Sequence, residues 1–94
     1  MKKYINASKT NPYELLGYIV DDMGYYRKIH LNTYASSIEK AISNFRHQIY
    51  TNPTYQGYRL VEDPNLMNVR LYRGPQYNRW PKLPSTAKLV NDSR

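Results

Sequence analysis

The chain lacks cysteine, and this absence excludes disulfides, thiolate metal sites and cysteine nucleophiles. It also lacks a long apolar run, because the longest stretch, residues 15–20, is interrupted by Gly17 and Tyr18 and is far too short to cross a membrane. The lysines at the start are not followed by an apolar segment, so no signal peptide is expected there. These absences favour a reducing compartment, and we expect a cytoplasmic protein with no membrane partner.

Acidic residues are scarce: the 94 residues include seven Asp and Glu against 14 Lys and Arg, which gives a net charge of +7. The surplus is uneven. Residues 1–63 carry eight Lys and Arg with six Asp and Glu, whereas residues 64–94 carry six Lys and Arg with Asp92 alone. A cationic segment attached to a nearly balanced body is typical of proteins that bind polyanions or an acidic protein surface.

Phe and Trp occur once each, whereas Tyr occurs 11 times. The hydrophobic fraction is 40% and the mean hydropathy is −0.81, both low for a small domain that must build its own core. A tyrosine ring buries a large apolar surface, but its hydroxyl needs a hydrogen-bond partner or water. The composition therefore suits half-buried sheet surfaces and interfaces better than a dry interior.

Hydrophobic periodicity predicts an α+β fold with the element order ββαββ. The expected strands cover residues 13–21, 25–33, 55–62 and 67–72, and the expected helix covers residues 37–50. Turn residues at positions 21–24 and 63–65 predict that each pair of strands forms a hairpin. The economical architecture is a small antiparallel sheet of about four strands with one helix packed on one face. The other face is left for water or a partner.

The helix carries the clearest local signal. Residues 36–39, Ser-Ser-Ile-Glu, fit a capping box in which Ser36 caps the helix and Glu39 reaches back. Apolar residues then recur at helical spacing up to Ile49, and residues 51–54, which include Pro53, end the helix. Residues 1–12 are predicted to form an arm, residues 13–73 a single α+β domain, and residues 74–94 an extended basic tail with three prolines.

No catalytic constellation is present in the sequence. His30 and His47 lack the spacing of metal ligands, and the four glycines are isolated and form no phosphate-binding loop. The acidic pairs at residues 21–22 and 62–63 lie at predicted turns, where Asp commonly bonds the backbone. We therefore expect a binding protein that is not an enzyme, with no cofactor and no metal.

The candidate binding residues combine rings and cations on the strand face opposite the aliphatic side chains, or in the tail. They are Tyr26, Lys28, His30, Arg59, Arg70, Tyr72, Arg73, Tyr77, Arg79, Trp80 and Lys82. Rings that stack on bases beside cations that neutralise phosphates form a platform for DNA or RNA, with single strands favoured, or for a nucleoprotein.

Other interpretations of these candidate residues stay open. Trp80 can fold back over the open end of the small core, and exposed Tyr and Arg are common on sheets that bind no nucleic acid. The same residue types anchor protein interfaces. The alternative to nucleic-acid binding is therefore protein binding. The chain would then be a small inhibitor of the phage or mobile-element type, such as an anti-CRISPR protein, that binds an acidic protein surface, or it would be an assembly subunit of a larger complex. The sheet edges leave the oligomeric state open.

One short passage resembles known DNA-binding domains. Residues 31–42 (LNTYASSIEKAI) resemble the passage from the last strand to the helix in AP2-type and integrase-arm DNA-binding domains. The aromatic residue of the helix is shifted by one place relative to those domains.

Overall fold

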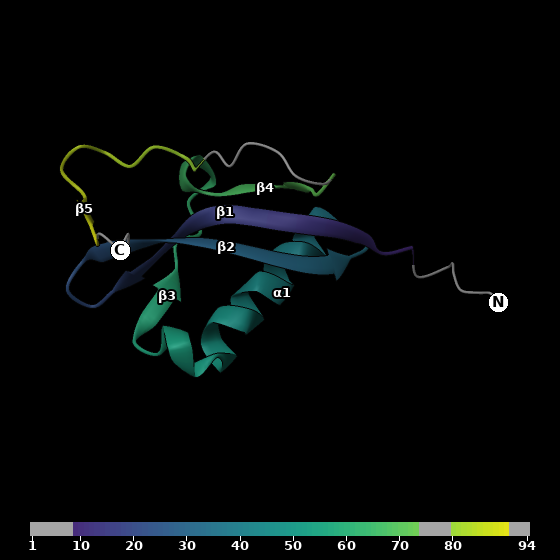
Figure 1. Ribbon diagram of the computed structural model, residues 1–94, viewed down its shortest axis with the longest axis horizontal. Coiled ribbons are helices and arrows are strands. Elements are labelled where there is room, and N and C mark those ends of the chain that lie inside the picture. Colours follow the sequence, from purple (N-terminus) through teal and green to yellow (C-terminus); the bar gives the residue numbers. More distant parts are fainter. Residues whose placement is uncertain (1–8, 74–79, 91–94) are drawn as a thin grey trace.

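The computed structural model describes residues 9–73 and 80–90, and within them it shows a mixed sheet of five strands with one α-helix (Figure 1). The α+β class is therefore confirmed. The elements are β1 (Asn11–Asp21), β2 (Tyr25–Ala35), α1 (Ile38–Thr51), the 3₁₀ helix η1 (Pro53–Tyr55), β3 (Tyr58–Leu60), the 3₁₀ helix η2 (Pro64–Leu66), β4 (Asn68–Leu71) and β5 (Lys88–Leu89).

The first hairpin forms as predicted, and it is the frame of the molecule. Strands β1 and β2 pair antiparallel from Asn11 opposite Ala35 to Val20 opposite Tyr26. Asp21 closes the turn, since its Oδ1 atom accepts main-chain N–H bonds at 2.9 Å from both of the residues at positions 23 and 25. Gly24 follows with φ of +86°, a conformation that glycine adopts without strain. Strand β1 begins two residues inside the predicted arm.

The second predicted hairpin is wrong. Strands β3 and β4 both pair antiparallel with β1, along the edge that β2 does not occupy. The residues between them form η2 instead of a tight turn, with Asp63 capping the N–H of Asn65 at 2.9 Å. Gly17 lies between the two pairing regions, and the Leu66 carbonyl oxygen comes within 3.4 Å of where a Cβ on Gly17 would stand. A small residue at this point lets the connecting segment pass close to β1.

The predicted sheet of about four antiparallel strands also needs correction. Strand β5 lies parallel to β2, with Lys88 opposite Tyr25 and Leu89 opposite Tyr26. It comes from the segment predicted as an extended tail, which instead returns to the sheet over residues 80–90. A two-residue strand carries no periodicity of its own, so the hydrophobic pattern could not reveal it.

Helix α1 begins one residue later than predicted. Ser37, not Ser36, is the N-cap, and its hydroxyl accepts from the main-chain N–H of Lys40 at 3.2 Å. The predicted capping box is therefore wrong, because the third helical position is Lys40 and not Glu39. The end of the helix at Thr51, ahead of Pro53, agrees with the prediction.

The core lies between α1 and one face of the sheet. Phe45 and Ile49 of the helix are almost fully buried against Leu15, Ile19 and Ile29 of the long strands. Two further helix side chains cover the outer edge of β2: Gln48 donates to the Asn32 carbonyl at 3.1 Å and Asn44 donates to the Tyr34 carbonyl at 3.2 Å. These bonds occupy groups that an unpaired edge would offer to another chain.

An ion pair joins α1 to the segment before η2. Arg46 donates two hydrogen bonds to the Glu62 carboxylate, at 2.7 and 2.8 Å, and these bonds lower the pKa of Glu62. Within the described residues, no helix is long and apolar enough to cross a membrane.

Candidate functional site

The sheet face opposite α1, called here the tail face, is where the candidate residues gather. In Figure 1, α1 lies below the β1–β2 pair and residues 80–90 arch above it. The even-numbered side chains of β1 and β2 point to this face because alternate residues of a strand face opposite sides. Leu16, Tyr18 and Val20 are buried here. The sequence predicts an open face, whereas the structure shows part of it covered by the chain's own C-terminal segment.

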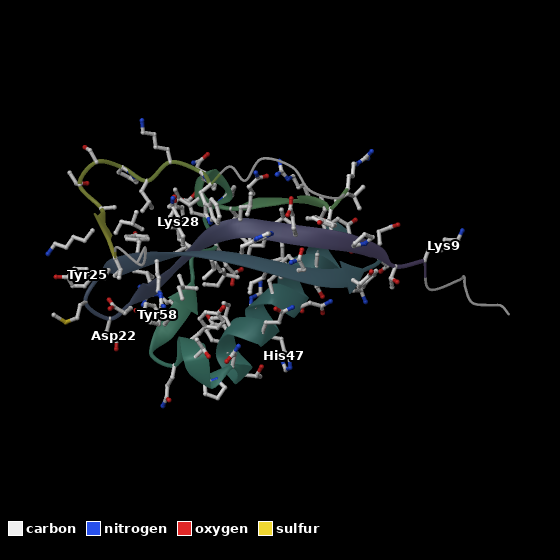
Figure 2. The ribbon with its side chains drawn as sticks, in the orientation of Figure 1. Lys9, Asp22, Tyr25, Lys28, His47 and Tyr58 are labelled. Atoms are coloured by element: carbon white, nitrogen blue, oxygen red, sulfur yellow. The ribbon has the colours of Figure 1, made fainter. Side chains whose placement is uncertain are left out.

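Trp80 is the centre of this covering segment and is half-buried. Its indole N–H donates to the main-chain carbonyl of Ile29 at 2.9 Å. The His30 ring meets it edge to face at a centroid distance of 6.3 Å, and the Lys28 ammonium lies 5.1 Å from the ring centroid. Figure 2 shows Lys28 on the side of β2 that faces the C-terminal segment. The structure thus brings together three of the predicted candidates, one from the tail and two from β2.

Between the sheet and residues 80–90 runs a groove of about 730 Å³, called here the tail groove. Tyr18 fixes the segment to the sheet, since its hydroxyl donates to the Pro81 carbonyl, and the Tyr26 ring packs edge-on against Tyr18 at 6.4 Å. Six residues that line the groove or stand at its rim are Tyr18, Lys28, Trp80, Lys82, Leu83 and Leu89. Two lysines and two large rings therefore border one open hollow.

A buried carboxylate, Glu14, belongs to the candidate site although the sequence did not nominate it. Its side chain is 1% exposed, and it accepts from Arg70 Nε at 2.9 Å while its other oxygen lies 3.0 Å from His30 Nε2. It is the one acidic side chain that the described strands direct onto the tail face, so this face keeps a positive balance. In the described part of the chain, no three His, Asp or Glu side chains gather as a metal site requires.

A second hollow of about 360 Å³, the tyrosine groove, lies on the same face beyond His30. Tyr34 from β2 and Tyr72 after β4 flank it, with exposed fractions of 68% and 38%. Its lining is completed by Pro12, His30, Asn32 and Thr33. His30 contacts Trp80 and also lines this groove, so the two grooves adjoin at His30.

The other predicted residues are more dispersed. Arg59 is exposed and stands opposite Val20, on the tail face but in β3. Arg73 is exposed just after β4. Tyr77 and Arg79 lie outside the described residues. His47, which the sequence gave no site role, is exposed on α1 and points away from the sheet in Figure 2.

Replacing Tyr18 by phenylalanine should loosen residues 80–90 from the sheet. The substitution removes one hydroxyl that donates to Pro81, which costs about 0.5–1.5 kcal/mol of docking energy. Quenching of Trp80 fluorescence by acrylamide should rise, because the indole becomes more accessible. Tyr50→Phe, at an exposed helix position, is the control. Unchanged quenching in Tyr18→Phe would contradict the role given to this contact.

The same tyrosine predicts a pH effect. Burial raises the pKa of Tyr18 above its ordinary value of 10.0, so the folded state favours the neutral phenol. The stability that depends on this group is complete below pH 10.0 and is lost as the pH rises through the raised folded-state pKa. Tyr18→Phe should reduce this alkaline loss.

No protein-family model, no curated protein and no solved structure matches the chain. No family match therefore supports the local resemblance of residues 31–42 to AP2-type and integrase-arm domains.

Proposed function

We propose that the protein binds single-stranded nucleic acid, or a nucleoprotein that presents it, through the tail face and without catalysis. The observation that carries this proposal is the contact of Lys28 and His30 with Trp80 at the border of the two grooves. Base stacking on an aromatic ring is worth about 1–3 kcal/mol per base, and an adjacent cation neutralises a phosphate. A cation and a ring side by side match the two parts of a nucleotide.

The charge of the tail face supports the same proposal. Lys28, Arg59 and Lys82 are exposed, and Arg70 lies further along the face, on β4 opposite Glu14. Glu14, the one carboxylate that the described strands direct onto this face, is buried and contacts Arg70 and His30. A polyanion that approaches the face therefore meets cations without an exposed strand carboxylate to repel it.

The grooves favour a single strand over a duplex. The tail groove is bounded by the sheet on one side and by residues 80–90 on the other. Tyr18 is only 3% exposed, so the half-buried Trp80 is the ring that the groove offers for stacking. Unpaired bases can splay out and stack on aromatic side chains, whereas a duplex keeps its bases stacked inward and offers mainly phosphates. We therefore expect duplex DNA to bind more weakly than a single strand of the same length.

Trp80 supplies the test, because it is the one tryptophan in the chain and lies on the proposed surface. Its fluorescence should change as single-stranded DNA or RNA oligonucleotides are added. The observed binding constant should fall with rising salt, with a log–log slope of about −0.7 for each phosphate contacted. Affinity that does not depend on salt, or no affinity for any DNA or RNA, would refute the proposed function.

A further inference from the structure

We propose that the tyrosine groove receives an unpaired base of the same strand whose phosphates pass Lys28 and Lys82. This inference rests on the proposed function and adds the site of base recognition. Different parts of the ligand occupy the two grooves. The tail groove holds the phosphate backbone and one base that stacks on Trp80, whereas the tyrosine groove holds another base between Tyr34 and Tyr72.

Exposure of the two rings is the first support. Tyr34 and Tyr72 are 68% and 38% exposed, and they flank a hollow of about 360 Å³. Neither ring belongs to the buried core cluster. A flat heterocycle that enters between two tyrosines gains stacking with either ring.

Polar groups in the groove can meet the edge of a base. Asn32 lines the groove, and its side-chain amide carries both a donor and an acceptor, the combination that matches a base edge. The main-chain carbonyl of Asn32 already accepts from Gln48, which fixes the strand at this point. His30 also lines the groove, and its Nε2 atom lies 3.0 Å from the Glu14 carboxylate.

The spacing of the two grooves suits a short oligonucleotide. Lys28 and Tyr34 are six residues apart on β2, which is about 20 Å at the rise of a strand. At the roughly 3.4 Å spacing of a stacked strand, this distance corresponds to about six nucleotides, and to fewer if the strand is extended. The two lysines lie at the tail-groove end of this path and the two exposed tyrosines at the other end. A nucleic acid carries both the phosphates that the lysines attract and the bases that the rings can stack on, and this match favours it as the occupant.

The experiment compares a thymidine hexanucleotide with inorganic polyphosphate, a polyanion that has no bases. Tyr34→Ala and Tyr72→Ala should each weaken binding of the hexanucleotide by about five- to hundredfold, because each removes a stacking ring. Neither variant should change the affinity for polyphosphate, which needs only the lysines. Tyr50→Ala, at an exposed position on α1, should change neither affinity.

The outcomes separate the two proposals. If the wild-type protein binds the hexanucleotide and both groove variants bind it as tightly as the wild type, the inference is overturned while the proposed function stands. If the groove variants lose affinity for polyphosphate to the same extent, the tyrosines do not act on bases and the inference also fails. If the wild-type protein binds no single strand, the proposed function fails and takes the inference with it.

Discussion

Replacing Phe45 by alanine should lower the free energy of unfolding by about 3–5 kcal/mol, the usual cost of removing a large ring from a core. Phe45 is fully buried and belongs to the cluster that joins α1 to the long strands. Alanine at this position would leave a cavity between the helix and the sheet. Urea denaturation followed by circular dichroism measures the change.

A loss of this size has a large consequence, because small domains are stable by only about 5–15 kcal/mol. The variant should therefore unfold at a much lower urea concentration. Tyr50→Ala, at a helix position that is 56% exposed, should change stability by no more than about 0.5 kcal/mol. Equal midpoints for Phe45→Ala and Tyr50→Ala would show that α1 does not pack as described.

Replacing Lys28 and Lys82 together by glutamine should weaken binding of a single strand by about ten- to hundredfold at low salt, because two charge-assisted contacts to phosphate are lost. The slope of the logarithm of the binding constant against the logarithm of the salt concentration should also become shallower by about 1.4. Anisotropy of a labelled oligonucleotide is the suitable readout, since the loss of Lys28 beside Trp80 alters the indole fluorescence itself.

A charge-matched control distinguishes the loss of two specific contacts from the loss of net positive charge. Lys9→Gln together with Lys40→Gln also removes two positive charges, one before β1 and one on α1. Figure 2 shows Lys9 at the end of the molecule far from Lys28. This variant should lose only a few-fold in affinity, because distant exposed charges are screened by salt. Equal losses in the two double variants would mean that the tail face is not the binding surface.

The sequence alone predicts the parts of the fold that local pattern encodes. The alternation of β2, with Ile29 and Leu31 on one side and Lys28 and His30 on the other, is confirmed by their burial. The turn ending at Gly24 and the stop of α1 are likewise confirmed. In each case a few neighbouring residues determine the geometry.

Contacts between distant residues could not be predicted in the same way. Strands β3 and β4 were assigned to each other because they are neighbours in sequence, yet each finds its partner in β1. Glu14 lies 16 residues from His30 and 56 from Arg70, so no local spacing connects them. Its one sequence signal is a carboxylate within an otherwise apolar buried strand, which requires a partner.

The candidate site was predicted in part. Alternation placed Lys28 and His30 on the correct face of β2, and Trp80 was chosen for its basic flanks. The alternative that Trp80 folds back over the open end of the small core was left open; in the structure Trp80 does fold back, and it contacts Lys28 and His30 on the tail face. The pairing of a two-residue strand with β2 and one hydroxyl contact from Tyr18 hold the segment, and neither leaves a pattern in the sequence.

Photo-cross-linking tests the central claim most directly. A single-stranded oligonucleotide that carries bromouracil is irradiated with the wild-type protein, and mass spectrometry identifies the modified side chains. We expect adducts on Trp80 and on the rings of the tyrosine groove, Tyr34 and Tyr72, and we expect them to disappear at high salt. Adducts confined to Tyr50 and Tyr55, which line a separate hollow at the end of α1, would contradict the account.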